Sequence, residues 1–394
     1  MGRWRMRKRL KWSCCLSSRW VWLSFGSFFR ASTRGRRARH LVALSTFFDS
    51  EIKPSIKDKP HTVSYGHAFQ ARRNEDFIVA KTNCQRVPGD HGSSTYDAFA
   101  ILDGHNGTAA AVFTKENLLD NVTNAVPSGL SRDEWLAALP RAMVAGFVKT
   151  DKDWQKKGTP YGTLRGKFSG TTATLVIVDG LTVTAACVGD SRCVLDAEGT
   201  VKALTIDHRL ETNEEERERV VASGGQVARL HPYGGREVGP LRAWPGGICL
   251  SRSIGDLDAG EYIVPVPHVK QIRLSPGGGR LIIASDGVWD ALSSEKVAKI
   301  CRGEKQPEVA AKNVVKEAVK IQGLRDDTTC LVVDIVPPGR ASRFFAPAIR
   351  KQLTVMKFLR FSRSKNKSVT QAPAMEELFE ETSATLAERL GTFP

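Results

Sequence analysis

Residues 172–188 have the sequence TATLVIVDGLTVTAACV, in which two apolar runs flank Asp179-Gly180-Leu181. Runs of this length that are rich in valine, isoleucine and threonine are typical of buried β-strands. A tight turn containing Asp-Gly joins strands that pair antiparallel. We therefore predict a β-hairpin with strands over residues 172–178 and 182–188.

Further strand-length apolar runs are separated by segments that carry helix start signals. The predicted strands cover residues 98–102, 281–284 and 330–336, and the predicted helices cover 131–154, 212–223 and 307–323. A capping box of Ser131 and Glu134 marks one helix start, and the first-turn proline Pro307 marks another. Because strands occur in hairpins while helices lie elsewhere, the chain is assigned to the α+β class, with sheets covered by helices.

The positive charge of the chain is concentrated at its two ends. The 394 residues carry 58 Lys and Arg against 42 Asp and Glu, a formal net charge of +16. Residues 1–48 contain 12 basic residues and no acidic one, and residues 339–394 contain 10 basic and 5 acidic residues. Residues 49–338 are left with 36 basic and 37 acidic side chains. A core with this balance is not expected to bind nucleic acid.

The composition predicts three parts: a basic aromatic leader (1–54), a globular domain (55–338) and a tail (339–394). The apolar stretch of the leader, residues 20–29, is shorter than the ~20 residues that cross a bilayer. The leader is typical of an organellar transit peptide, of a membrane-surface anchor palmitoylated at Cys14 or Cys15, or of a disordered segment.

The tail begins as a basic amphipathic stretch and ends acidic. Within residues 343–363, Phe345, Ile349, Leu353 and Met356 share one helical face among basic side chains. Such a stretch binds calmodulin or a membrane surface in some proteins, and a solvated, partly disordered tail is the alternative.

The eight cysteines form no C-x-x-C pair and indicate reduced thiols of an intracellular protein. We expect the cytosol or nucleus, unless residues 1–48 direct the chain to a membrane or an organelle.

Four short stretches place an aspartate at or just past the end of an apolar run. They are Asn74-Glu75-Asp76, Leu102-Asp103-Gly104-His105, Ala284-Ser285-Asp286-Gly287 and Arg325-Asp326-Asp327-Thr328-Thr329. Carboxylates on the ends of neighbouring strands can converge on one point, and hard divalent cations take oxygen ligands. Glycine allows close backbone approach, and histidine has a suitable pKa for proton donation. The pattern is the outline of a two-metal hydrolase.

These stretches belong to seven motifs that resemble, in order, those of the metal-dependent (type 2C) Ser/Thr protein phosphatases in their plant form. The motifs begin at Arg73, Asp103, Ser169, Val188, Leu250, Ala284 and Asp326, and read RNED, DGHNG, SGTTA, VGDSR, LSRSIGD, ASDGVWD and DDTT. The resemblance implies two antiparallel sheets packed face to face with helices on both outer sides, an α-β-β-α sandwich. It makes residues 55–338 the catalytic domain.

The resemblance also implies hydrolysis of phosphoserine and phosphothreonine in proteins at a centre of two Mn²⁺ or Mg²⁺ ions. Asp103 would bridge the ions, and the Gly104 carbonyl would bind one of them. The other expected ligands are Asp76, Asp286 and Asp326, with Glu75 and Asp290 holding metal waters. A bridging water would attack phosphorus, and His105 would be the general acid for the departing hydroxyl.

Two positions depart from the family pattern. In many members an arginine four residues before Glu75 grips the phosphate, but this position is Ala71, so Arg72 or Arg73 would supply the guanidinium. The aspartate that holds a third ion in some members is replaced by Lys167. A third ion bound in that way is therefore not expected.

Other functions remain open from the sequence. Asp190 and Asp256 are expected to bond to loops rather than to a metal. A pseudophosphatase that binds phosphoproteins without hydrolysing them is one alternative, although clustered carboxylates are costly to keep in a dead site. A membrane-tethered adaptor, acting through the two basic ends, could coexist with catalysis. We expect a monomer whose substrate choice depends on a flap within residues 213–247.

Overall fold

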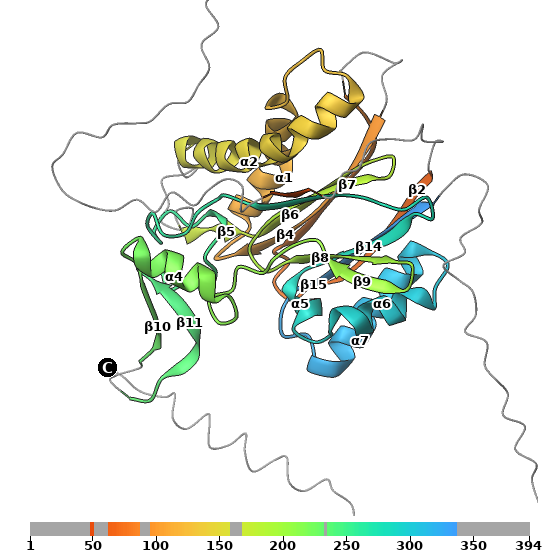
Figure 1. Ribbon diagram of the computed structural model, residues 1–394. Coiled ribbons are helices and arrows are strands. Elements are labelled where there is room, and N and C mark those ends of the chain that lie inside the picture. Colours follow the sequence, from red (N-terminus) through yellow and green to blue (C-terminus); the bar gives the residue numbers. More distant parts are fainter. Residues whose placement is uncertain (1–47, 51–61, 87–94, 158–167, 232–234, 337–394) are drawn as a thin grey trace, which may run out of the picture. The chain divides into compact units, whose positions relative to one another are not determined.

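The computed structural model describes residues 48–50, 62–86, 95–157, 168–231 and 235–336 (Figure 1). The predicted tail and nearly all of the predicted leader lie outside these ranges. The amphipathic stretch 343–363 and Lys167 lie outside them as well. The boundaries of the three predicted parts, and the expectations for both ends, therefore stay predictions.

Two β-sheets form the centre of the described region. The first contains, in order, β1 (Phe48–Ser50), β13 (His268–Arg273), β7 (Thr182–Val188), β6 (Ala173–Asp179), β4 (Thr95–His105), β5 (Gly170–Thr171) and β12 (Ile254–Gly255), with β3 (Asp76–Gln85) paired to β4. The second contains, in order, β2 (Thr62–Gln70), β15 (Thr328–Val336), β14 (Gly279–Ala284), β8 (Arg192–Ala197) and β9 (Thr200–Ala203). The predicted hairpin is confirmed, because β6 and β7 pair antiparallel with Asp179 opposite Thr182.

Neighbouring strands are antiparallel throughout both sheets, apart from the parallel pair β1–β13. The sequence did not predict β1, which is only three residues long.

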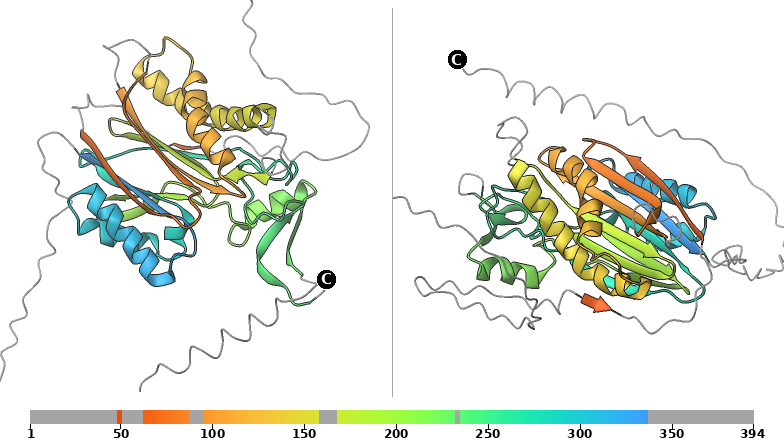
Figure 2. Two further views of the ribbon diagram at one scale, coloured as in Figure 1. Left: turned by 180° about the vertical axis from the view of Figure 1, so that it is seen from behind. Right: turned by 90° about the horizontal axis from the view of Figure 1, so that it is seen from above.

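Helices cover the outer face of each sheet (Figures 1 and 2). The helices α1 (Ala109–Asn124) and α2 (Arg132–Lys157) pack on the first sheet, and α5 (Asp286–Trp289), α6 (Ser294–Arg302) and α7 (Pro307–Gln322) pack on the second. A smaller unit consists of α4 (Glu214–Ala222) and the antiparallel hairpin of β10 (Gln226–Leu230) and β11 (Val238–Trp244). The described region is thus the expected α-β-β-α sandwich. None of its helices combines the length and hydropathy that a membrane span requires.

The strands are apolar on both faces because each sheet is covered on both faces. In β4, Phe99 and Ile101 pack between the two sheets, whereas Ala100 and Leu102 pack under α1 and α2. The same alternation in β14 sends Leu281 between the sheets. Apolar side chains fill the three interfaces between the four layers of the sandwich. Fully burying one large apolar side chain contributes roughly 1.5–3 kcal/mol, so these interfaces account for most of the favourable folding free energy.

The described cysteines are free thiols. Of the six, Cys187, Cys193, Cys301 and Cys330 are buried, while Cys84 and Cys249 are half-buried. The reduced state in the cell stays a prediction.

Candidate metal centre and active site

The end of β4 and the start of β3 bring two of the predicted aspartates side by side. Asp103 is opposite Asp76 in the antiparallel register. The Asp103 carbonyl accepts hydrogen bonds from the Thr172 N–H, at 2.8 Å, and from the Thr171 hydroxyl, at 3.1 Å. The next residue is Gly104, and only glycine fits at this position. A Cβ there would lie 2.9 Å from the Glu75 carbonyl oxygen, too close for a side chain.

A third predicted aspartate, Asp286, is the first residue of α5 and follows β14 through Ser285. The Ser285 hydroxyl donates to Asp76 Oδ2 at 2.8 Å and so joins this turn to β3. Gly287 permits close packing of α5, since a Cβ there would lie 2.2 Å from the Asp327 carbonyl oxygen. This contact brings α5 against the segment that carries Asp326.

The loop before β3 is held by Asp327, a residue for which no role was predicted. Its carboxylate accepts hydrogen bonds from the backbone N–H groups of Arg72, Arg73, Glu75 and Asp76, including 2.7 Å from Arg73 and 2.5 Å from Glu75. Burial raises the pKa of Asp327, but the backbone donors outweigh burial and hold this pKa below its usual value. Asp327 therefore fixes the loop as an ionised carboxylate.

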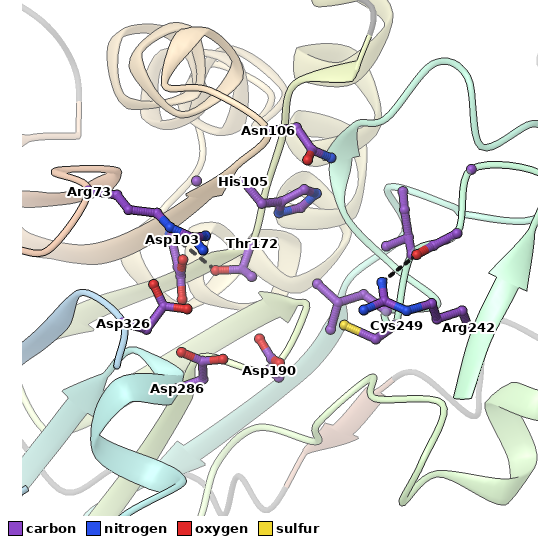
Figure 3. Close-up of a pocket in the computed structure, with 15 residues that line it drawn as sticks. Arg73, Asp103, His105, Asn106, Thr172, Asp190, Arg242, Cys249, Asp286 and Asp326 are labelled. Carbon is purple, nitrogen blue, oxygen red and sulfur yellow. Dashed lines mark hydrogen bonds between the residues drawn. The ribbon is translucent and has the colours of Figure 1, made fainter. Parts of the chain in front are cut away.

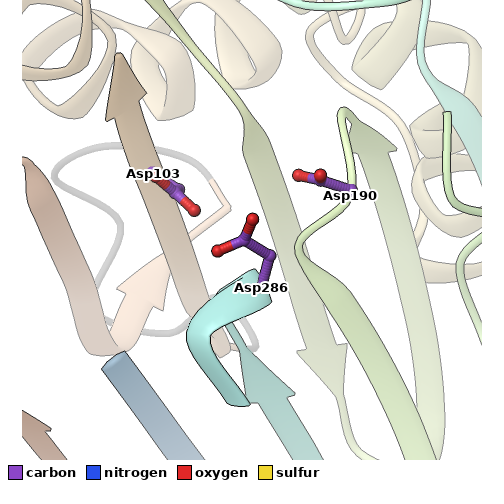
Figure 4. A group of neighbouring side chains, drawn as sticks. All are labelled: Asp103, Asp190 and Asp286. Carbon is purple, nitrogen blue, oxygen red and sulfur yellow. The ribbon is translucent and has the colours of Figure 1, made fainter. Parts of the chain in front are cut away.

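These elements surround one cavity of about 270 Å³ (Figure 3). Asp103, Asp286 and Asp326 all line it, with their carboxylates facing a common space. Carboxylate oxygens of Asp103, Asp190 and Asp286 lie within 4.8 Å of one another (Figure 4). Asp190 was expected to bond to a loop, so its place in this group is a feature that the sequence reasoning missed.

Burial and mutual repulsion dominate the electrostatics of these carboxylates. Burial, followed by repulsion from Asp76 and Asp286, raises the pKa of Asp103 well above its ordinary value. Burial, followed by Asp190, does the same for Asp286, and burial raises the pKa of Asp76 to about 6. Asp76 Oδ1 is buried without a hydrogen-bond partner among the described residues. An all-oxygen donor set with an unsatisfied buried oxygen fits hard divalent cations such as Mn²⁺ or Mg²⁺.

Arg209 is a basic residue that pairs with two carboxylates of the cluster, Asp190 and Asp286. Its guanidinium donates to Asp190 at 2.5 Å, to Asp286 at 2.7 Å and to Asp290 at 2.6 Å. Asp290, a predicted holder of metal waters, is half exposed and does not line the cavity. Arg209 compensates part of the negative charge, and the sequence reasoning did not identify it.

His105 lies at the cavity wall next to a buried carboxylate. Its Nε2 is 2.8 and 2.9 Å from the two carboxylate oxygens of Asp256. Burial lowers the pKa of His105, but the charge of Asp256 outweighs burial and raises this pKa above its ordinary value. His105 is therefore set up to carry a proton, and Asp256 is its partner rather than only a loop anchor.

The two arginines proposed for phosphate binding lie differently. Arg73 lines the cavity with a largely exposed side chain, 3.9 Å from Glu75. The Arg72 guanidinium instead donates to the Arg325 carbonyl oxygen. Glu75 accepts a hydrogen bond from the Gly107 N–H at 3.1 Å, so it braces the loop that follows His105.

A sandwich of two antiparallel sheets, with buried carboxylates and a carboxylate-paired histidine converging at one end, defines a metal-dependent phosphoester hydrolase. Residues 64–326 match the family described as Protein phosphatase 2C, and the chain belongs to that family.

Relatives in flowering plants support the assignment. Probable protein phosphatase 2C 5 of Arabidopsis thaliana is 56% identical over 367 residues, which cover 91% of this chain and 83% of the relative. Probable protein phosphatase 2C 33 of Oryza sativa subsp. japonica is 56% identical over 373 residues, covering 92% and 84%. The chain is thus a plant type 2C phosphatase, a metal-dependent enzyme that acts on phosphoserine and phosphothreonine in proteins.

Solved structures share the fold at low identity. The serine-threonine phosphatase 2C of Toxoplasma gondii is 20% identical, with a TM-score of 0.54, over 72% of this chain and 97% of its own. A sex determining protein of C. elegans is also 20% identical, with a TM-score of 0.58, over 74% and 69%. Both likenesses confirm the sandwich architecture.

Proposed function

We propose that the acidic cavity holds two Mn²⁺ or Mg²⁺ ions and hydrolyses phosphoserine and phosphothreonine by direct attack of water. The observation that carries this proposal is the meeting of Asp103 at the end of β4, Asp190 in the bend between β7 and β8, and Asp286 at the start of α5. The proposed ligands are Asp76, Asp103, the Gly104 carbonyl, Asp286 and Asp326, with Glu75 and Asp290 holding metal waters. When bound, the ions supply positive charge for the phosphoryl oxygens and make water acidic enough to act near neutral pH.

The remaining steps fall to side chains around the cavity. Arg73 would bind phosphoryl oxygens, since its exposed guanidinium faces the cavity whereas that of Arg72 is turned to Arg325. His105 would protonate the departing serine or threonine oxygen, because an alkoxide is a poor leaving group. Burial lowers the pKa of His105, but the charge of Asp256 outweighs burial and raises this pKa, which favours the protonated ring that this step needs.

The test is metal-dependent phosphate release from a phosphoserine peptide by the full chain. A chelator should abolish release, and Mn²⁺ or Mg²⁺ should restore it. Asp103→Asn should lower kcat by roughly 10²–10³-fold, the usual cost of losing one charge-stabilising group. Asp153→Asn is the control, because Asp153 lies on the outer helix α2 beside Lys149 and should leave kcat unchanged. Tight peptide binding without phosphate release in Mn²⁺ would contradict the proposal and indicate a pseudophosphatase.

Partners and compartment belong to the same proposal. The expected substrates are phosphoproteins, and the expected state is a monomer in the cytosol or nucleus. Contact of residues 343–363 with calmodulin or a membrane surface stays a prediction, as does targeting by residues 1–48, because both segments lie outside the described residues.

A further inference from the structure

The end of β4 and two strands of two residues each, β5 and β12, bring His105 close to a turn that is distant in the sequence. His105 on β4 is opposite Gly170 on β5, and Gly170 is opposite Gly255 on β12. The residue after Gly255 is Asp256, so its backbone lies two strand spacings from His105, with β5 between them. The β4–β5–β12 register thus brings Asp256 to His105.

The Asp256 carboxylate reaches the His105 ring by passing over the backbone of Gly170, which has no side chain. A Cβ at Gly170 would lie 2.3 Å from both Asp256 carboxylate oxygens, so only glycine lets this side chain pass. Asp256 has φ 52° and Gly255 has φ 99°, two consecutive left-handed residues that an unrestrained chain seldom adopts. The turn therefore needs contacts that hold it in this conformation.

One such contact comes from the outer helix layer. Asp151 of α2 is buried, 5% exposed, and its Oδ1 accepts the Gly255 N–H at 2.9 Å. Its Oδ2 accepts from the Gln155 side chain at 2.6 Å. Among the described residues no basic side chain forms an ion pair with Asp151, so its burial carries a desolvation cost that an apolar residue would avoid. In return, the buried Asp151 carboxylate holds the turn at residues 255–256 through its hydrogen bond from the Gly255 N–H.

We propose that Asp151 and Asp256 are positioning residues for His105, which makes helix α2 part of the catalytic apparatus. Asp151 holds the Gly255 N–H, the turn aims the Asp256 carboxylate, and Asp256 fixes the imidazole ring so that its other nitrogen faces the leaving oxygen. This rests on the proposed function only in taking His105 as the proton donor. In the step itself the water oxygen forms a bond to phosphorus and gives up a proton to solvent, the P–O bond to the serine oxygen breaks, and the serine oxygen takes the proton from His105.

The leaving group gives the test. A serine alkoxide needs a proton as it departs, whereas p-nitrophenolate is stable enough to leave without one, so loss of the positioned acid affects only the first substrate. In the full Mn²⁺-loaded chain, Asp256→Asn should lower kcat for a phosphoserine peptide by roughly 100-fold and Asp151→Ala by roughly 10-fold. Turnover of p-nitrophenyl phosphate should fall less than about 3-fold in both.

Two further variants keep the result interpretable. Asp151→Asn retains an oxygen for the Gly255 N–H and should recover most of the peptide activity lost in Asp151→Ala. Thr150→Ala removes a neighbouring buried α2 side chain that bonds Gly146 and Asn121 instead, and it should leave the ratio of the two activities unchanged.

Equal losses on both substrates, or no loss on the peptide, in Asp256→Asn and Asp151→Ala would overturn the inference. His105→Gln separates this failure from failure of the proposed function. If His105→Gln loses peptide turnover selectively and the aspartate variants do not, only the positioning role is wrong. If the parent enzyme hydrolyses neither substrate with Mn²⁺, the proposed function is wrong.

Discussion

Arg209 shows how much a single residue contributes to the acidic cavity, because it is the cation that joins Asp190, Asp286 and Asp290. Arg209→Met would leave these carboxylates to repel one another in the metal-free protein. We expect a loss of about 2 kcal/mol in the free energy of unfolding, less than for a fully buried pair because the Arg209 side chain is 27% exposed. Added Mn²⁺ would supply the missing charge, so the Mn²⁺-induced rise in Tm should be larger in the variant than in the parent.

Arg302→Met is the matched control for Arg209→Met. Arg302 pairs with the buried Asp196 at 2.6 Å, outside the cavity. Its loss should lower Tm but leave the Mn²⁺-induced rise as in the parent. An unchanged Mn²⁺ response in Arg209→Met would show that the arginine does not compensate the charge of the metal ligands.

His208 gives a residue-scale prediction for pH. It is buried, with Nδ1 3.0 Å from the Gly189 carbonyl oxygen, and burial followed by Arg252 lowers its pKa to about 3. The unfolded chain binds a proton at His208 below about pH 6.5, whereas the folded chain stays neutral until about pH 3. Stability therefore falls as the pH drops through this window, by at most about 1.4 kcal/mol per pH unit from this residue.

The measurement compares the parent with His208→Asn by urea unfolding in saturating Mn²⁺. Between about pH 6.5 and 5 the parent should lose roughly 1.5 kcal/mol more stability than the variant. Saturating metal is needed because the raised pKa of Asp76 acts in the opposite direction in the metal-free protein. A constant difference between parent and variant across this pH range would contradict the assignment of a neutral His208.

At the scale of elements, the close approach of α1 and α2 depends on one glycine. A Cβ at Gly146 would lie 2.4 Å from Val122 Cγ2 and 2.7 Å from Val122 Cα. Because one of these atoms is backbone, Gly146→Ala must push the helices apart. We expect a loss of roughly 1–3 kcal/mol in the free energy of unfolding, measured by denaturant titration.

Gly303→Ala is the comparison for Gly146→Ala. Gly303 ends α6 with φ −73°, and the nearest atom to its added Cβ would be 3.4 Å away, an ordinary contact. This variant should be as stable as the parent or slightly more stable. Equal stability of the two alanine variants would mean that α1 and α2 separate without cost.

The elements that the sequence predicted are those whose signals are local. Ser131 and Glu134 form the expected capping box at the start of α2, with Ser131 N–H and hydroxyl both donating to Glu134. Pro307 opens α7, and Gly323 follows its last turn with φ 70°. The hairpin β10–β11 was not predicted, because its strands are only partly buried and lack an apolar run.

The site could be predicted only in part, because some of its residues carry a local sequence signal and others do not. Asp76, Asp103, Asp286 and Asp326 stand out because of their place beside apolar runs, and the structure brings them to one end of the sandwich. The roles of Asp190 and Asp256 depend instead on strand register and on contacts between distant segments. No local pattern carries that information.

At the scale of the whole molecule, the catalytic region and the two ends of the chain differ in net charge. Residues 49–338 are nearly neutral, so the net charge of +16 resides in residues 1–48 and 339–394. Each basic residue near an anionic lipid surface contributes about 1 kcal/mol, and salt screens this attraction. The full chain should therefore sediment with phosphatidylserine vesicles at low salt and be released at high salt.

A chain of residues 48–338, which retains β1, should not sediment with such vesicles. It should keep kcat/KM for p-nitrophenyl phosphate within about 2-fold, because every residue that lines the cavity lies within residues 48–338. Neutral phosphatidylcholine vesicles are the control for the lipid charge. Binding of the shortened chain, or equal binding of the full chain to both vesicle types, would mean that the basic ends do not act as an electrostatic anchor.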